Sequence, residues 1–335
     1  MTRKPKKLLN HPNDVPAEQL EGLLYACHGK LSKVEGYSGV IRTDIADQQV
    51  VVVTGGGSGH EPMFAGFVGK GLADAAALGE IFTSPSPDII IETTKAAQKG
   101  QGVLFVYGNY AGDNMNFDIA AELLEEEEGI TVKTVRVTDD ISAAPPERMQ
   151  ERRGVAGDMY VLKIAGAAVQ SGYDLDALHE VTSKANFNTR TMGVALAACS
   201  IPQTGKFNFE LADDELELGM GIHGETGVRR QKLTSADEIN QEIVDRICAD
   251  IGLQAGDRVC VTINNLGAAT YTELLISNRK VHQELAKRGI QVHDTLIGSY
   301  CTSQEMAGYS VTLFRLDDEL QKLYDLPCDG FAWRK

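Results

Sequence analysis

The sequence predicts an α/β fold with two α/β domains, each built on a central sheet that is largely parallel or mixed. Short runs of β-branched and apolar residues alternate with stretches of helical periodicity, an alternation that is typical of βαβ units. The chain has 335 residues, and at roughly 150 residues per domain this length corresponds to two domains. We expect an N-terminal domain over residues 1–187 and a C-terminal domain over residues 188–335.

The first half of the chain carries the clearer alternation. Apolar runs predict strands at residues 50–53, 103–106 and 132–137, and helical patterns lie between them at 88–98 and 116–127. The first two runs are apolar without interruption, as expected for strands that are buried on both faces. The acidic run at residues 125–128 fits the exposed end of a helix that stops at Gly129.

A second series of elements follows. Helical patterns cover residues 155–170, 175–185 and 271–288, and strand-like runs cover residues 192–198, 258–263 and 311–316. Residues 212–232 hold several glycines around His223 and show no clear periodicity, which predicts a loop. Loops on a rigid scaffold often carry function, so this segment is a candidate site.

The charge of the chain excludes some partners. With 32 Lys and Arg against 47 Asp and Glu, the formal charge is −15. This balance argues against nucleic acid and against anionic membrane surfaces, because phosphate contacts need clustered positive charge. The sequence also lacks an apolar run of about 18 residues, the length of a membrane span.

The cysteines and the N-terminus indicate the compartment. The six cysteines are scattered, with no C-x-x-C pair and no zinc-like spacing, so we expect reduced thiols. The basic run at residues 3–7 has no apolar core after it, so we do not expect a signal peptide. Together these features predict a cytoplasmic protein.

The most distinctive local feature is the segment VTGGGSGHEP at residues 53–62, directly after a predicted buried strand. Glycines let a ligand approach the backbone closely, and open α/β sheets bind ligands at the carboxyl ends of their strands. The dinucleotide fingerprint fails because its third glycine falls on His60 or Pro62, and the P-loop tripeptide Gly-Lys-Ser/Thr occurs nowhere. We expect a ligand loop that holds neither ATP nor NAD; a tight strand-to-helix turn is the alternative.

A second candidate segment, residues 107–117, follows the next predicted strand. Asp113 lies between this strand and a helix, where it is either a helix N-cap or a general base. As a base it would face the same crevice as His60, because both segments leave the same edge of one parallel sheet.

The segment at residues 82–88 leads into the predicted helix at residues 88–98. Ser86 and Asp88 both fit the position of a helix cap. Ser84 lies further from the helix, and its hydroxyl is a candidate ligand contact.

His223 lies between Gly221 and Gly224, which leave its imidazole sterically open. A neutral imidazole can act as a base, as a metal ligand or as a nucleophile. A metal site needs several ligands at set spacing, and none of the seven histidines forms such a pair, so we expect no metal. The alternative for His223 is an ordinary surface or core histidine.

Seven blocks, taken in order, give the chain a family resemblance. They are GGGSGHEP (55–62), GEIFTSPSPD (79–88), NYAGDNMNF (109–117), RRGVAG (152–157), GIHGE (221–225), NNLGA (264–268) and YCTSQEMAG (300–308). Together they resemble the K subunit, the dihydroxyacetone-binding part, of dihydroxyacetone kinase. The resemblance covers about residues 9–333, and the first and fifth blocks are the most specific.

The resemblance implies a homodimer of chains with two α/β domains. It also implies that dihydroxyacetone binds covalently, as a hemiaminal, to the histidine that matches His223. His60 matches the family's second catalytic histidine, and Asp113 matches its catalytic acid.

The resemblance further implies how substrate and phosphoryl donor are held. Gly57, Ser58, Gly59 and Ser84 match positions that hold the ketone. The donor is implied to be ATP, with ADP and Mg on a separate nucleotide-binding L subunit, or a phosphotransferase-system protein. No cofactor is expected on this chain itself.

The chain departs from the family at Gly108, where the kinases usually have a lysine that reaches the substrate. The vacated volume predicts room for a four-carbon ketose of the erythrulose type beside dihydroxyacetone. The alternative is that another basic side chain reaches the same spot, in which case the preference stays with three carbons. The sequence at residues 142–151 also departs from the usual family sequence.

A role without catalysis is the competing function. Some relatives of the K subunit bind the ketone and serve as coactivators of transcription regulators. The presence of His60, Asp113 and His223 favours the kinase subunit, because a pure sensor could lose the general base.

Overall fold

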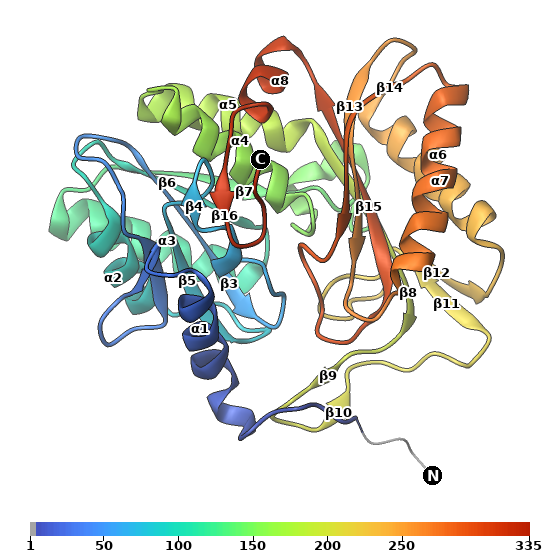
Figure 1. Ribbon diagram of the computed structural model, residues 1–335, viewed down its shortest axis with the longest axis horizontal. Helices are drawn as coiled ribbons and strands as arrows, with labels where there is room; N and C mark the ends of the chain where they lie inside the picture. Colours follow the sequence, from blue (N-terminus) through green and yellow to red (C-terminus); the bar gives the residue numbers. More distant parts are fainter. Residues whose placement is uncertain (1–4) are drawn as a thin grey trace. The chain divides into compact units, whose positions relative to one another are not determined.

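The computed structural model describes residues 5–335. Residues 1–4, which include the start of the basic run at residues 3–7, lie outside the described residues. The chain folds into two compact units (Figure 1). The N-terminal unit consists of Lys7–Val137, Asp158–Asn186 and Leu320–Lys335, and the C-terminal unit consists chiefly of Thr138–Gly157 and Phe187–Glu319.

The two units are interleaved along the chain. Within residues 7–335 the chain passes between them at residues 137/138, 157/158, 186/187 and 319/320. The third passage lies next to the predicted domain boundary at residues 187/188. However, residues 138–157 belong to the C-terminal unit although they precede that boundary, and residues 320–335 belong to the N-terminal unit although they follow it. The division into residues 1–187 and 188–335 stays a prediction.

A six-stranded sheet forms the centre of the N-terminal unit, in the order β1-β2-β5-β3-β6-β7. Its strands are β1 (Leu31–Lys33), β2 (Gly39–Arg42), β3 (Val51–Ser58), β5 (Ala75–Ile81), β6 (Val103–Gly108) and β7 (Val132–Val137). β3 pairs in parallel with both β5 and β6, and β6 pairs in parallel with β7, whereas β1 and β2 are antiparallel. The carboxyl ends of β3, β5 and β6 therefore meet at one edge of the sheet.

Helices cover this sheet. They are α1 (Val15–Ala26), α2 (Pro87–Ala97), α3 (Ala111–Glu128), α4 (Asp158–Gln170) and α5 (Leu175–Phe187), with the short turns η1 (Pro12–Asp14) and η2 (Ala65–Phe67). α2 and α3 pack against Val51, Val53 and Phe105 in one apolar cluster. Val52 and Leu104, at alternating positions, are also fully buried, so β3 and β6 are buried on both faces as predicted. A two-stranded pair, β4 (Gly69–Lys70) with β16 (Asp329–Gly330), joins the C-terminal tail to this unit.

The C-terminal unit has its own six-stranded sheet, in the order β12-β11-β8-β15-β13-β14. Its strands are β8 (Thr189–Ala197), β11 (Glu215–Leu218), β12 (Arg229–Lys232), β13 (Arg258–Asn265), β14 (Gln291–Gly298) and β15 (Ala307–Leu316). Only the β13–β14 pair is parallel; the others are antiparallel. A separate ribbon is formed by β9 (Ser200–Ile201) and β10 (Lys206–Phe207).

Two long helices pack on this second sheet. α6 (Ala236–Ile251) and α7 (Tyr271–Lys287) both begin with a capping box, Ser235 with Glu238 and Thr270 with Glu273. α6 contributes Ile243, Val244 and Ile247 to the apolar core. The remaining elements are η3 (Pro146–Glu151) and α8 (Asp318–Tyr324).

The α/β class is confirmed, and both sheets are mixed. Three predicted boundaries were wrong in ways that bear on the site. β3 continues to Ser58 instead of ending at residue 53, α3 begins at Ala111 instead of 116, and the predicted loop at 212–232 contains β11 and β12. β11 and β12 have only four residues each, too few to show a period in the sequence.

Candidate active site

The glycine segment is part of strand β3. Gly55, Gly56 and Gly57 all lie inside the strand. A Cβ at Gly56 would lie 2.2 Å from the ring of Phe64, and a Cβ at Gly57 would lie 2.7 Å from the backbone nitrogen of Thr83. Close packing within the protein therefore already requires glycine at these two positions.

The turn after β3 is held by a partly buried carboxylate. Gly59 has a φ of +105°, and its backbone N–H donates to both carboxylate oxygens of Glu61, at 2.9 and 3.1 Å. The amide of Gln19, on α1, donates to Glu61 at 2.7 Å. Ser58 donates its hydroxyl to the carbonyl of Gly79 at 2.7 Å, which ties β3 to β5. The predicted part of Ser58 and Gly59 in holding a ligand stays a prediction.

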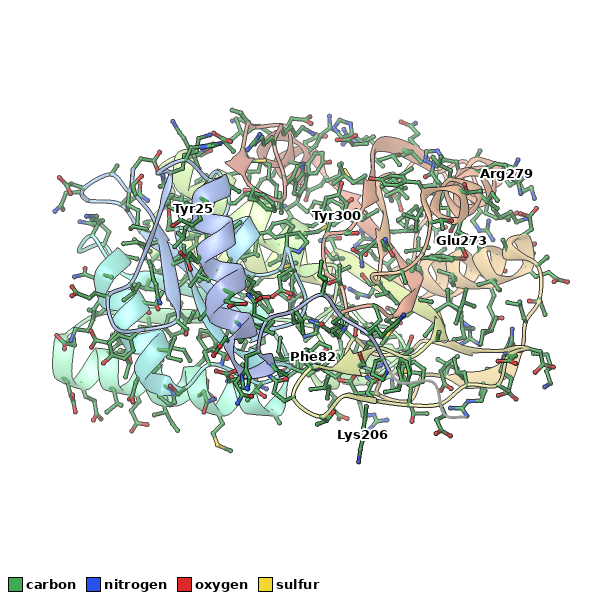
Figure 2. All side chains as sticks on the ribbon, turned by 60° about the horizontal axis from the view of Figure 1, so that its bottom comes forward. Tyr25, Phe82, Lys206, Glu273, Arg279 and Tyr300 are labelled. Atoms are coloured by element: carbon green, nitrogen blue, oxygen red, sulfur yellow. The ribbon has the colours of Figure 1, made fainter. Side chains whose placement is uncertain are left out.

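His60 is buried, with 2% of its surface exposed. Its ring stacks on Phe82, the residue after β5, with ring centroids 4.8 Å apart and planes at 26°; Figure 2 labels Phe82. Stacking on a neighbouring ring limits rotation of the imidazole. A limited orientation suits a group that transfers a proton to one atom of a ligand.

Ser84 lies beside the first turns of α3, the helix that carries Asp113. Asn116 donates its amide to Ser84 Oγ at 3.2 Å and to the carbonyl of Pro85 at 2.8 Å. A Cβ at Gly112 would lie 3.5 Å from that of Ser84. Tyr110 is the N-cap residue, so Asp113 is in the first turn of the helix and is not its cap. The helix dipole favours a negative charge there.

Gly108 is the last residue of β6 and is buried. It pairs with Val137 of β7. The following residue, Asn109, donates its N–H to the Val137 carbonyl at 3.0 Å and accepts from the Asn114 amide at 2.8 Å. Gly108 thus lies between a strand and the helix that carries Asp113, on a short and well-bonded connection.

One sheet edge gathers most of the predicted site residues. Gly57 and Ser58 end β3, and Gly59 and His60 follow it. Ser84 follows β5, Gly108 ends β6, and Asp113 lies in the first turn of α3. Parallel pairing of these three strands brings their carboxyl ends together, as the sequence predicted. The roles of these residues stay predictions. His223 belongs to the other unit.

His223 lies between β11 and β12, and one carboxylate fixes both its ring and its backbone. Glu225 Oε1 lies 2.9 Å from Nδ1 of His223, and Oε2 accepts the His223 backbone N–H at 2.9 Å. Burial would raise the pKa of Glu225, but the hydrogen bond and charge of His223 outweigh it and lower the pKa to about 2. The His223 side chain itself remains 26% exposed.

The backbone around His223 is anchored on both sides. Asn208 donates its amide to the carbonyl of His223 at 2.8 Å. Ser303 donates its hydroxyl to the carbonyl of Ile222. Asn264 in turn holds the loop that carries Ser303, because its side-chain oxygen accepts the N–H of Cys301 at 3.0 Å and its amide donates to the Cys301 carbonyl at 2.7 Å.

Sequence reasoning missed Glu225, Ser303 and Asn264 as individual residues, although all three lie in the blocks that carry the resemblance. The spacing His-x-Glu is a usable signal for Glu225, because it places a carboxylate two residues from the imidazole. The contacts of Ser303 and Asn264 are long-range and leave no local signal.

The His223–Glu225 pair defines what this histidine can do. A carboxylate that accepts from Nδ1–H stabilises the tautomer in which Nε2 carries the lone pair. Nε2 is then available as a base or as a nucleophile toward an electrophilic carbon. The carboxylate also stabilises positive charge that develops on the ring.

Within residues 5–335, no cluster of three or more His, Cys, Asp or Glu side chains is arranged to hold a metal ion. In that same range no helix combines the length and apolar character needed to cross a bilayer. All six cysteines are buried thiols.

Comparison with known proteins shows the family of the chain. Residues 21–332 match the Dak1 domain model. The chain is 45% identical over 326 residues to the dihydroxyacetone-binding subunit DhaK of the PTS-dependent dihydroxyacetone kinase 2 of Listeria innocua, covering 97% of this chain and 98% of that protein. The chain therefore belongs to the Dak1 family, the family of the K subunits of dihydroxyacetone kinases, as the resemblance predicted.

Two further relatives are similar over nearly the whole chain. The L-erythrulose kinase of Pectobacterium atrosepticum is 43% identical over 98% of this chain, and the chain spans 56% of that protein's length. Among solved structures, a dihydroxyacetone kinase operon co-activator superposes with a TM-score of 0.89 at 31% identity, covering 95% of this chain and 98% of that one. The relatives thus include both kinases and a co-activator.

Proposed function

We propose that the chain is the substrate-binding subunit of a kinase for dihydroxyacetone or a related short-chain ketose. The observation that carries this proposal is the His223–Glu225 pair, with Nδ1 and Oε1 2.9 Å apart, in a chain that belongs to the Dak1 family. The name of the Listeria relative, a dihydroxyacetone-binding subunit, supports the class of substrate.

In the proposed first step, His223 captures the ketone covalently. Nε2 adds to the carbonyl carbon, so a C–N bond forms and the C=O π bond breaks. Glu225 keeps its hydrogen bond from Nδ1–H and stabilises the positive charge that the ring gains, and His60 delivers a proton to the carbonyl oxygen, which becomes the hydroxyl of a hemiaminal. Covalent capture selects ketones over polyols such as glycerol. It also supplies binding that a ligand of few atoms cannot gain otherwise, since even the best small ligands reach only about 1.5 kcal/mol per heavy atom.

In the proposed second step, Asp113 acts as general base. It takes the proton of a terminal hydroxyl while that oxygen attacks the phosphorus of the donor in line. Gly57, Ser58, Gly59 and Ser84 position the ketone. The bound ketone thus presents a single hydroxyl for transfer.

We place the phosphoryl donor on a partner. It is either ATP with Mg on a separate nucleotide-binding L subunit or a phosphotransferase-system protein; the words "PTS-dependent" in the name of the Listeria kinase support the latter. The absence of P-loop and dinucleotide motifs from this sequence fits a donor held elsewhere. We further propose a homodimer in the cytoplasm, where the six buried cysteine thiols would stay reduced.

Mass spectrometry of the intact protein tests covalent capture. After incubation with dihydroxyacetone and mild reduction, we expect one adduct per chain, and peptide mapping should assign it to His223. His223→Ala should remove it. An adduct that persists at the same level in His223→Ala contradicts the assignment.

The second candidate function, favoured by the superposition with an operon co-activator, is a ketose sensor that does not support turnover. Reconstitution separates the two. With the L subunit of its own organism and a phosphoryl donor, a kinase subunit turns over ketose, and Asp113→Asn abolishes turnover while the His223 adduct remains. If no L subunit or donor supports turnover, and the chain binds both ketose and a transcription regulator, the sensor is the correct function.

We also propose that the substrate range includes four-carbon ketoses. Gly108 stands where family kinases usually have a lysine, which removes a charged side chain from the ligand end of β6. The similarity to an L-erythrulose kinase supports this extension. Erythrulose has one CHOH unit more than dihydroxyacetone. The volume left by the missing lysine side chain would accommodate this unit.

A further inference from the structure

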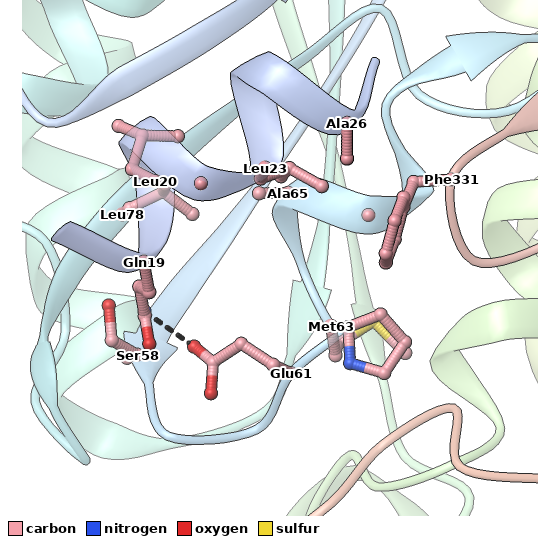
Figure 3. A pocket seen from close by; sticks show the side chains of 14 residues that line it. Gln19, Leu20, Leu23, Ala26, Ser58, Glu61, Met63, Ala65, Leu78 and Phe331 are labelled. Carbon is pink, nitrogen blue, oxygen red and sulfur yellow. Dashed lines mark hydrogen bonds between the residues drawn. The ribbon is translucent and has the colours of Figure 1, made fainter. Parts of the chain in front are cut away.

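A cavity of about 220 Å³ lies in the N-terminal unit, between α1 and the segment that carries His60 (Figure 3). α1 contributes Leu20, Leu23 and Ala26, and Leu78 and Met63 extend the apolar wall. An engineered apolar cavity of about 150 Å³ is known to admit benzene. This cavity therefore has room for a small organic molecule, and its walls favour an apolar one.

One side of the cavity is polar. Glu61 lines it, and Figure 3 shows its carboxylate across the cavity from Leu20 and Leu78. This carboxylate accepts hydrogen bonds from the Gln19 amide, at 2.7 Å, and from the backbone of Gly59. Burial raises the pKa of Glu61, and the hydrogen bonds only partly offset that effect. A group that donates hydrogen bonds or carries positive charge would complement this carboxylate, whereas an anion would be repelled.

The cavity has an accessible mouth. Gly22 and Ala26, which line it, are exposed residues of α1, and Phe331 at its rim is 50% exposed. α1 buries only Val15 and Leu20 among its residues, so few apolar contacts hold it over the cavity. A ligand can therefore enter along the helix without unfolding a strand.

We propose that this cavity is a binding site for a small apolar molecule that carries one ammonium or hydroxyl group. The alkyl part packs between α1 and Leu78, and the polar group contacts Glu61. A short-chain ketose does not suit the site, because it has an oxygen on every carbon and the wall is mainly apolar. The site is thus distinct from the proposed ketose site, although Gly57 and Ser58 line both.

Isothermal titration of the full chain, without ketose, tests the chemistry of the ligand. The probes are n-pentylamine, n-pentanol and n-pentanoate, which share one alkyl chain and differ in the polar group. We expect saturable binding of one amine or alcohol per chain, with the amine at least as tight as the alcohol and pentanoate at least tenfold weaker. Equal binding of pentanoate, or no saturable binding of amine and alcohol, overturns the proposal.

Substitution at Gly22 tests the location. Gly22 lines the cavity, and a Cβ there would meet no atom within 4 Å, so a larger side chain fits at this position of the wall. Gly22→Leu should weaken both amine and alcohol at least tenfold, while Gly22→Ala, the matched control, should keep them. Both substitutions favour the helix, so an unchanged or higher Tm is expected. Unchanged affinity in a folded Gly22→Leu protein overturns the location.

A second variant tests the polar contact. Glu61→Gln removes the charge and keeps the size of the side chain. We expect it to weaken the amine relative to the alcohol by at least tenfold. An unchanged amine-to-alcohol ratio in folded Glu61→Gln contradicts the assigned role of Glu61. Because no arm of the experiment uses a ketose or His223, its failure is separate from failure of the proposed ketose chemistry.

Discussion

Glu225 holds His223 through two separate hydrogen bonds, one from the ring Nδ1 to Oε1 and one from the backbone N–H to Oε2, each 2.9 Å long. A single carboxylate therefore sets both the tautomer of the imidazole and the path of the chain around it. The Arg153 guanidinium adds positive charge near Glu225 and also pairs with Asp140 at 2.7 Å. His223 is thus part of a small charged network.

Removing this carboxylate should slow covalent capture. We expect Glu225→Ala to lower the rate of adduct formation on His223 about 10–100-fold, in line with the loss of a group that orients a functional histidine. Glu225→Gln should lose less, because its amide oxygen can still accept from Nδ1–H. Time-resolved mass spectrometry measures both rates, with Glu215→Gln on β11 as control. Equal rates in Glu225→Ala and the native protein would contradict the role.

Asp139 should make stability depend on pH. Burial raises its pKa to about 6 from an ordinary 3.8, although Thr191 and the backbone N–H groups of Val155 and Gly157 oppose the rise. The folded state therefore binds this proton more tightly than the unfolded state. The resulting stabilisation is full below about pH 4, falls as the pH rises to about 6, and amounts to at most about 3 kcal/mol.

Urea unfolding of the native protein and of Asp139→Asn at pH 4.5, 6 and 7.5 measures this effect. The substitution removes the titrating group, so it should be most damaging at pH 4.5 and less damaging at pH 7.5. Asp237→Asn on α6, whose side chain is 45% exposed, is the control. A difference between native protein and Asp139→Asn that is constant with pH would show that Asp139 does not titrate in this range.

Asp250 should be critical for the stability of the C-terminal unit. Its carboxylate accepts from Arg152, at 2.6 and 2.8 Å, and from Arg190, at 2.6 Å, and these arginines are 0% and 4% exposed. Burial would raise the pKa of Asp250, but the hydrogen bonds from the two arginines lower it. Asp250→Ala leaves two buried cations without their carboxylate, so we expect a loss of about 3–5 kcal/mol in the free energy of unfolding.

A matched control lies on the same helix. Asp245 pairs with Arg288, and their side chains are 50% and 28% exposed. Asp245→Ala should therefore cost at most about 1 kcal/mol. Urea denaturation of both variants checks the contrast; losses of equal size would refute the special status of Asp250.

Gly56 should tolerate no side chain while Phe64 is present. A Cβ at Gly56 would lie 2.2 Å from the Phe64 ring, which is itself buried. We expect Gly56→Ala to destabilise the protein by about 1–3 kcal/mol through overpacking. Combining it with Phe64→Leu should recover part of the loss, and a double-mutant cycle measures the coupling. Additive losses would indicate that the two positions do not compete for space.

Gly108 should set the substrate range. Restoring the family's usual residue with Gly108→Lys should tighten dihydroxyacetone about tenfold to a hundredfold, the typical value of a charge-assisted hydrogen bond, and should weaken erythrulose. Titration of the His223 adduct with both ketoses measures the ranking. If dihydroxyacetone binds at least tenfold tighter than erythrulose in the native protein, and Gly108→Lys leaves that ranking unchanged, the proposed extension to four-carbon ketoses is refuted.

The fold was predictable where elements are long and apolar. β6 and α7 follow their sequence patterns closely, and β3 was found by its four valines. β5 was missed because AAALGEI is rich in alanine, which has low β-propensity. α6 was also missed, although Ser235 and Glu238 have the sequence spacing of a capping box. Acidic residues lie among its apolar positions and weaken the helical pattern in the sequence.

The candidate site was predictable at strand ends and along motifs. His60, Asp113 and His223 became candidates because each stands next to glycines in a distinctive block. The supporting residues were not, because Ser303 reaches Ile222 across 81 positions of sequence and no local pattern records such a contact. Likewise, Phe64 and Thr83 leave no room for a Cβ at Gly56 and Gly57 of β3, and these contacts form only in the folded chain.

The repeated passage of the chain between its two units limits how this protein could have arisen and how it can be dissected. Within residues 7–335 four peptide connections join the units. A cut at any one of these connections leaves three others that still join the two units. No single truncation yields either unit complete. Simple end-to-end fusion of two finished genes would produce one connection, so it does not account for this architecture. An engineer who wants one unit alone must rejoin separate segments with new loops.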